Sequence, residues 1–214
     1  MFRLSLTKSI ALCISIALTT LTMACKSGGE DKSKLAEVSA TGAPGEDMSG
    51  LVTEDIPGTP IKRAREVDAN GILKIEGFLL DGKKTGQWIQ YTPDGDIVLI
   101  NSYVNGLLDG VVTRMSYRNQ VDLRIHYKNG MMDGQYTAYK FGKLVEERYY
   151  KEDKLDGVSK TYDDHTFKLK QEVEYKNGLQ DGFFRYYDEE GKLSPEYQYK
   201  NGEKVSGGII EPAK

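Results

Sequence analysis

The chain has 214 residues, of which 29% are charged and 39% hydrophobic, and its formal net charge at pH 7 is −3. A mildly acidic chain with interspersed charges lacks the positive footprint that nucleic-acid phosphates select, so we expect no nucleic-acid partner. Its two cysteines, Cys13 and Cys25, both lie near the amino terminus, which leaves the rest of the chain without a disulfide, a thiolate metal site or a cysteine nucleophile.

Residues 1–24 have the features of a signal peptide. Arg3 and Lys8 precede a 12-residue apolar run, Ile10 to Leu21, which is too short to span a membrane comfortably. Ala24-Cys25 follows, and this ending resembles the lipobox of bacterial lipoproteins. The resemblance implies cleavage before Cys25 and lipidation of its side chain and amino terminus, which suffices for stable anchoring. The alternative is an ordinary secretory signal with an incidental cysteine.

Anchoring at Cys25 implies that the membrane is a partner and that the protein resides in the bacterial cell envelope. We expect the outer membrane, on its periplasmic or surface side. Cleavage removes two positive charges, Arg3 and Lys8, and changes the formal charge from −3 to −5. Residues 25–61 comprise the lipidated cysteine and a segment rich in Gly, Ser, Ala, Pro, Glu and Lys, without a sustained apolar period. We interpret this segment as a disordered tether.

Residues 62–210 contain a repeated turn of the form Asn-Gly-x-x-Asp-Gly. Its closing glycine recurs at intervals of 24, 24, 23 and 25 residues, at Gly86, Gly110, Gly134, Gly157 and Gly182. The opening glycine lies four residues earlier, at Gly82, Gly106, Gly130 and Gly178, and Asp153 occupies this place once. Such self-similarity indicates a repeat array in which each unit contacts its neighbours, rather than an enzyme with one buried active site.

Each repeat reads as two strands and two turns. One tyrosine follows the closing glycine by five residues, at Tyr91, Tyr139, Tyr162 and Tyr187. Another precedes the opening glycine by three residues, at Tyr103, Tyr127, Tyr150, Tyr175 and Tyr199. Aromatic residues between glycine-centred turns favour strands. The prediction is an all-β fold, an elongated single-layer antiparallel β-meander of five to six 24-residue hairpin repeats.

A single layer leaves its tyrosine-rich side without a covering layer, so we interpret these nine tyrosines as a candidate binding face. The opposite side is predicted to carry Lys128, Lys151, Lys176 and Lys200, with Glu147, Glu172 and Glu196 four residues before the last three. Their repetition indicates a solvated ladder of opposite charges rather than catalytic carboxylate–lysine pairs. The glycines and their Asn or Asp neighbours are predicted to form structural turns, because these residues tolerate positive φ.

Little in the sequence points to catalysis. His126 and His165 lie in different repeats, and neither has a nucleophile partner in a recognisable motif. Asp163, Asp164 and His165 could bind a metal weakly, but we interpret them as a polar loop and predict no metal or cofactor. Trp88 is predicted to lie opposite Tyr91, either covered at the amino-terminal end of the array or exposed as a contact residue.

The segment from Tyr127 to Tyr139 resembles a MORN repeat, specifically the bacterial variant grouped with antitoxin-like MORN proteins. The resemblance implies an elongated meander that serves as a binding or scaffold surface. Two functions fit these features: a non-catalytic envelope lipoprotein that binds a protein or a glycan, or an antitoxin or immunity protein that neutralises an envelope-acting toxin.

Overall fold

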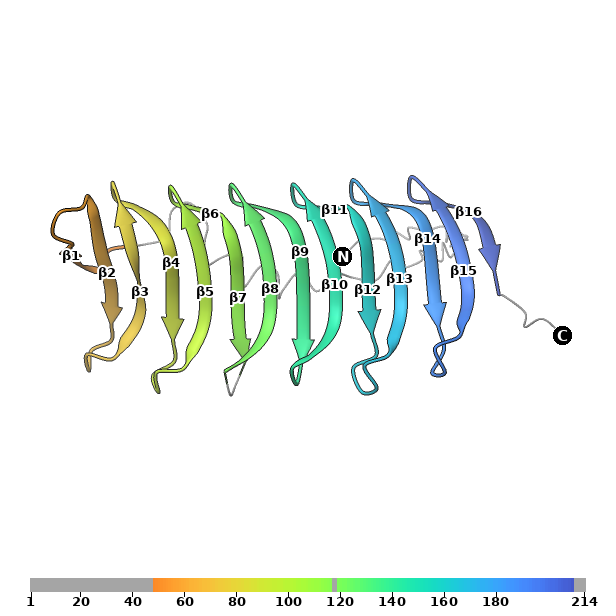
Figure 1. Cartoon of the computed structure of the whole chain (residues 1–214), viewed down its shortest axis with the longest axis horizontal. Helices are drawn as coiled ribbons and strands as arrows, with labels where there is room; N and C mark the ends of the chain where they lie inside the picture. Colours follow the sequence, from red (N-terminus) through yellow and green to blue (C-terminus); the bar gives the residue numbers. More distant parts are fainter. Residues whose placement is uncertain (1–47, 117–118, 210–214) are drawn as a thin grey trace, which may run out of the picture.

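The computed structural model describes residues 48–116 and 119–209, in which all regular secondary structure is β-strand. The predicted signal peptide, Cys25 and most of the predicted tether lie outside these ranges. Sixteen antiparallel strands form one open sheet, an elongated single-layer meander (Figure 1), as the sequence predicted. Neighbours in the sheet follow chain order, so every strand contact is local.

The strand bounds show how two-strand units recur along the chain. The first half contains β1 (Val52–Asp55), β2 (Ile61–Val67), β3 (Leu73–Leu80), β4 (Lys83–Tyr91), β5 (Ile97–Val104), β6 (Leu107–Leu108), β7 (Gly110–Ser116) and β8 (Gln120–Lys128). The second half contains β9 (Met131–Lys140), β10 (Lys143–Lys151), β11 (Lys154–Leu155), β12 (Gly157–Tyr162), β13 (Leu169–Lys176), β14 (Leu179–Tyr187), β15 (Leu193–Lys200) and β16 (Glu203–Gly208). The short strands β6 and β11 pair only with β5 and β10.

The sheet begins earlier than the sequence predicted. Strand β1 lies within the segment expected to be a tether and pairs antiparallel with β2, from Val52 opposite Arg65 to Asp55 opposite Lys62. All four of its residues are exposed, so no buried apolar side marks it in the sequence. It is held by backbone pairing and by cross-strand ion pairs of 3.1 Å, Glu54 with Arg65 and Asp55 with Lys62.

The opening turns are two-residue hairpin turns, as predicted. Asn129 (φ 51°) and Gly130 (φ 83°) both adopt positive φ between β8 and β9. Two consecutive positive φ values match the right-handed twist of the flanking strands. Glu152 (φ 49°) and Asp153 (φ 64°) adopt the same conformation without a glycine.

The closing Asp-Gly pairs are not hairpin turns, which corrects the prediction. Gly134 lies inside β9 and Gly182 inside β14, and the pairing register shifts beside each of them. Gly134 has φ 116°, and a Cβ there would lie 3.0 Å from the Cβ of His126. The closing glycine is therefore a bend within a strand, at a backbone conformation that other residues rarely adopt.

The turn aspartates bond each repeat to the next. Asp109 Oδ2 accepts a hydrogen bond from the backbone N–H of Asn129 at 3.1 Å, and Asp156 Oδ2 accepts one from Asn177 at 3.1 Å. Beside them, the N–H of Gly130 donates to the carbonyl of Leu108 at 2.7 Å. Equivalent backbone bonds recur at Gly106, Asp153, Gly178 and Gly202. The opening turn of each repeat is thus fixed to the bend of the repeat before it, along one long edge of the sheet (Figure 1).

One side of the sheet is buried, and we call it the core face; the other side is the open face. Residues opposite one another in register share a face, as Val112, Ile125 and Tyr136 do on neighbouring strands. A continuous cluster of buried side chains on the core face extends from Ala64 in β2 to Tyr150 in β10. The strands curve along their length (Figure 1), and register shifts at most strand pairs promote this curvature. Curvature and neighbouring side chains, rather than a second sheet, bury the core face within the described residues.

We predict that Asp156→Ala destabilises the array by about 1–2 kcal/mol, because it removes the acceptor for the backbone N–H of Asn177. The measurement is the midpoint of urea unfolding. Asp156→Asn keeps an oxygen acceptor and should retain most of the stability. Asp94→Ala, at an exposed turn on the opposite edge, is the control and should change stability by less than about 0.5 kcal/mol. Equal effects of both alanine variants would contradict a role for the aspartate as a link between repeats.

Candidate binding surface

The nine predicted tyrosines lie on both faces of the sheet, which corrects the single binding face expected from the sequence. The second tyrosine of each repeat faces a closing glycine across the strand pair: Gly86 with Tyr103, Gly110 with Tyr127, Gly134 with Tyr150, Gly157 with Tyr175 and Gly182 with Tyr199. These five lie on the core face. Tyr91, Tyr139, Tyr162 and Tyr187 follow the closing glycine by five residues, an odd number, so the alternation of a strand places them on the open face.

Three of the core-face tyrosines are buried and offer no surface on which a macromolecular partner could dock. Tyr103 is 2% exposed, Tyr127 5% and Tyr150 6%. Each of them stands opposite a closing glycine in the register of the sheet. Trp88 packs edge-on against Tyr103 with 6.4 Å between ring centroids, and it is buried. Of the two alternatives for Trp88, the structure shows the covered one.

Two of the open-face tyrosines, Tyr91 and Tyr187, bind a glutamate of the preceding strand. Tyr91 donates its hydroxyl hydrogen bond to Glu76 at 2.8 Å, and Tyr187 donates to Glu172 at 3.1 Å. Burial and the hydrogen bond to Glu76 raise the pKa of Tyr91 to about 12. Burial, followed by the negative charges of Glu147 and Glu172, raises the pKa of Tyr162. These tyrosines are half-buried and have a structural role on the open face.

The open-face charges form cross-strand contacts, and the partners differ from the glutamates and lysines four residues apart that the sequence pattern emphasised. Arg185 donates from Nε to Glu196 at 2.7 Å and lies 3.6 Å from Glu174, whereas Lys200 binds Asp181 at 3.0 Å. Residues four apart in a strand are separated by about 13 Å, so a glutamate and a lysine at that spacing do not meet. Partners on neighbouring strands are about 5 Å apart, and they form the ion pairs.

An ion pair that was not predicted from the sequence lies on the core face. Arg148 donates from Nε to Glu146 at 2.9 Å and from Nη1 to the hydroxyl of Tyr150 at 3.2 Å, and its guanidinium lies 5.5 Å from the Tyr136 ring centroid. Burial opposes ionisation of Arg148, but the Glu146 charge and the Tyr150 hydrogen bond outweigh it and raise the pKa of Arg148. Burial and the charge of Glu146 raise the pKa of Tyr136 to about 12. The spacing i, i+2 of Glu146 and Arg148 is the only sequence signal for this pair.

The accessible aromatic surface lies at the carboxyl-terminal end of the core face. Phe184 packs against three tyrosine rings, with centroid distances of 6.4 Å to Tyr186, 5.9 Å to Tyr197 and 6.3 Å to Tyr199. Tyr175 lies on the same face, and all five side chains are half-buried. We call Tyr175, Phe184, Tyr186, Tyr197 and Tyr199 the C-terminal aromatic surface. Lys204 Nζ lies 4.1 Å from the Tyr197 ring centroid and adds a positive charge.

Two of these five residues, Tyr175 and Tyr199, belong to the binding face predicted from the sequence. Phe184, Tyr186 and Tyr197 do not, because they do not recur at the aligned positions of every repeat. The sequence pattern that could have identified them is alternation along a strand, because Phe184 and Tyr186 are two residues apart, as are Tyr197 and Tyr199.

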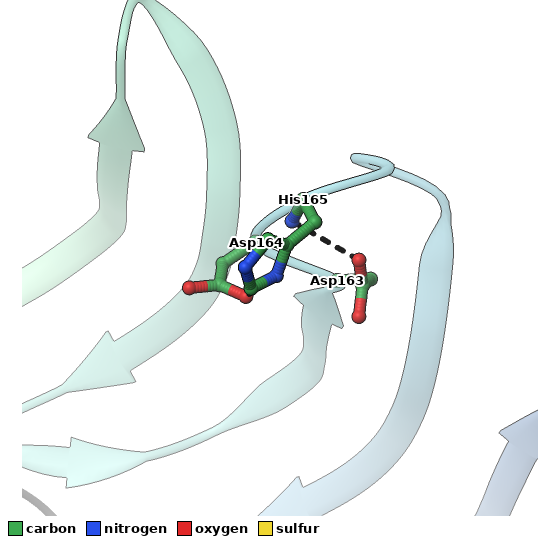
Figure 2. Close-up of side chains that lie close together, drawn as sticks. All are labelled: Asp163, Asp164 and His165. Atoms are coloured by element: carbon green, nitrogen blue, oxygen red, sulfur yellow. Dashed lines mark hydrogen bonds and ion pairs between the residues drawn. The ribbon is translucent and has the colours of Figure 1, made fainter.

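Asp163, Asp164 and His165 gather in the exposed loop between β12 and β13 (Figure 2). Asp163 Oδ1 accepts backbone hydrogen bonds from His165 at 3.0 Å and Thr166 at 2.8 Å, and these bonds lower the pKa of Asp163. Asp164 binds Lys140 and His165 Nδ1, and the bond to Lys140 is the main cause that lowers its pKa. The carboxylates therefore have loop-forming roles. His126 lies in a different strand, β8, and its Nδ1 donates a hydrogen bond to the carbonyl of Gln135 at 2.8 Å.

The chain matches no protein-family model and no curated protein. Across residues 48–116 and 119–209, no helix is long and apolar enough to cross a membrane.

We predict that the protein loses stability as the pH rises from 10 towards 12. Tyrosine ionises near pH 10 in the unfolded chain, whereas the pKa of Tyr136 is about 12 in the fold, so folding favours the neutral phenol. That stabilisation is complete below pH 10 and is lost as the pH rises through the folded pKa. The measurement is urea unfolding across this pH range, with phenolate absorbance as a second signal. Tyr136→Phe should fold at neutral pH and lose less stability at alkaline pH than the native chain; an unchanged pH dependence would show that other groups cause it.

Proposed function

We propose that this protein is a non-catalytic lipoprotein of the bacterial cell envelope whose repeat sheet binds a protein or a glycan. The C-terminal aromatic surface is the observation that supports the proposal most. Five aromatic side chains gather there on one face, and no second layer of the described chain covers them. Tyrosine suits such a surface because its ring makes apolar contact while its hydroxyl remains hydrated.

The exposure of side chains on the core face differs along the array, and this difference supports a binding role at the carboxyl-terminal end. From β7 to β10 the core face is closed by buried aliphatic and aromatic side chains, such as Leu123 and Ile125 at 1% exposure. From β13 to β15 the same face keeps its rings in contact with one another but half-exposed. Contiguous exposed aromatic area marks interaction sites more often than it serves stability alone.

The location in the cell envelope is proposed from the lipobox-like end of the signal peptide at Ala24-Cys25. Because Cys25 is the only cysteine of the mature chain, its substitution tests the anchor alone. We predict that Cys25→Ser blocks lipidation and moves the protein from the detergent phase to the aqueous phase, or leaves an uncleaved precursor. The measurement is phase partitioning together with the mass of the amino-terminal peptide. A Cys25→Ser protein that is cleaved and still partitions into detergent would overturn the anchor.

The binding role is tested by substitution within the C-terminal aromatic surface. We predict that Tyr186→Ser combined with Tyr197→Ser weakens partner binding by about tenfold or more, since a single aromatic anchor at an interface contributes about 1–2 kcal/mol or more. The measurement is quantitative capture from envelope extracts by the full lipidated protein, with purified protein and glycan fractions compared.

A matched control removes two exposed rings elsewhere. Phe141→Ser combined with Tyr149→Ser alters side chains that are 79% and 40% exposed and lie outside the surface. This control should bind as the native chain does, and both double variants must retain native strand content. Equal binding by all three proteins would reject the surface. A partner that proves to be an envelope-acting toxin would replace the scaffold role with the alternative immunity role.

A further inference from the structure

A hollow opens on the core face at the amino-terminal end of the array. Its lining combines apolar and aromatic residues, Met48, Leu51, Ile75, Trp88 and Tyr103, with polar and charged residues, Glu66, Lys84, Gln90 and Asn101. Its volume is about 150 Å³. A dry cavity of about this volume holds one benzene molecule, so the hollow has room for a group of several non-hydrogen atoms.

Asn101 is the unusual member of this wall. It is 2% exposed, and its Oδ1 has no hydrogen-bond partner among the described residues, although its Nδ2 donates to the Tyr103 hydroxyl at 3.3 Å. A buried carbonyl oxygen without a donor is costly, so a donor group of a bound molecule would satisfy it. The terminal torsion of asparagine is soft, and a small rotation brings an amide acceptor towards the hollow.

A donor, Lys84, lines the same hollow. Lys84 Nζ lies 4.6 Å from the Trp88 ring centroid and 5.1 Å from that of Tyr103. An ammonium has three N–H donors, so it can donate to a ligand in addition to the interactions it already makes. The wall therefore combines one acceptor, one cationic donor and apolar surface from Leu51 and Ile75.

We propose that this hollow binds the acetamido group of an N-acetylated sugar. The N–H of that group donates to Asn101 Oδ1, its carbonyl oxygen accepts from Lys84 Nζ, and its methyl group packs against Leu51 and Ile75. An acetamido group has four non-hydrogen atoms and fits the available volume, while the sugar ring lies at the mouth, where Glu66 and Gln90 can bind hydroxyl groups. The inference rests on the proposed function only in taking the ligand from envelope glycans.

An N-acetylated peptide carries the same group but fits this place less well. The hollow lies over β3, β4 and β5, which are interior strands with pairing partners on both sides. Their backbone groups are used in the sheet, so a peptide strand could not add to it here by main-chain hydrogen bonds. Side chains alone therefore have to bind the ligand here, and this suits a sugar better than a peptide strand.

Trp88 is the only tryptophan of the chain and lines the hollow, so its fluorescence reports occupancy directly. The experiment titrates N-acetylglucosamine into the full lipidated protein in detergent and compares glucosamine, glucose and N-acetyl-lysine methylamide. We expect a saturable change in Trp88 emission with N-acetylglucosamine, and affinities at least about tenfold weaker for the two sugars without the acetamido group. A similar response to glucose, or tighter binding of N-acetyl-lysine methylamide, would overturn the proposal, as would the absence of saturable binding.

Two variants separate a ligand role from a structural one. Asn101→Leu removes the acceptor and should abolish binding while the melting temperature stays equal or rises, because an unsatisfied buried amide is replaced by an apolar side chain. Lys84→Met keeps the apolar stem over Trp88 and Tyr103, removes the donor, and should weaken binding about tenfold. Gln87→Leu, exposed on the open face of the same strand, is the control and should bind normally.

Normal binding by Asn101→Leu or by Lys84→Met would reject the assigned contacts. The C-terminal aromatic surface is intact in both variants, so its partner binding is measured in parallel. A chain that loses N-acetylglucosamine but captures its envelope partner separates the two sites, and failure of either site leaves the other unaffected.

Discussion

A sheet that is one layer thick depends on the hydrogen bonds between its successive repeats. In this protein the turn aspartate of one repeat accepts the backbone N–H of the opening turn of the next, as Asp109 does for Asn129 and Asp181 for Asn201. The neighbouring backbone bond, such as Gly202 N–H to the carbonyl of Gln180, fixes the same two elements. Both bonds require the opening turn and the closing bend to stand side by side, and the six-residue turn motif meets this requirement. The regular spacing of the array follows from it, since each unit is positioned by the one before.

The closing glycine connects this backbone pattern to the core. Its positive φ bends the strand, and a core-face tyrosine stands opposite it in register, as in the pair Gly134 and Tyr150. Backbone and side-chain requirements therefore recur with the same period. The open-face tyrosines have a different task, because Tyr91 and Tyr187 bind glutamates across the sheet. One residue type thus fills the core on one face and links strands on the other.

The two ends of the core face differ in how well they are covered. At the amino-terminal end, Leu51 packs against the core cluster, Trp88 lies over Gly77 and donates to the carbonyl of Phe78, and a small polar hollow remains. At the carboxyl-terminal end, rings such as Phe184 and Tyr197 are the main apolar side chains, and they remain half-exposed. A repeat array can support such a division because each repeat is stabilised locally, so its ends are free to carry different surfaces. The proposed partner surface and the proposed sugar site follow this division.

The sequence by itself determined the period, the strand content, the opening turns and the order of strands in the sheet. These features depend on local chemistry: glycine and asparagine at positive φ, aromatic residues in short strands, and a motif that recurs about every 24 residues. Only the tertiary structure decided that Gly134 and its counterparts are bends, that the tyrosines divide between two faces, and that β1 joins the sheet. The sequence does not assign these residues to a face because side chains alternate between the faces with period two along a strand. One bulge or one odd spacing therefore reverses the assignment of every residue that follows. Solvent accessibility cannot be predicted from the sequence for a related reason. The burial of Tyr127 and the half-exposure of Tyr199 depend on the side chains that the neighbouring strands place beside them.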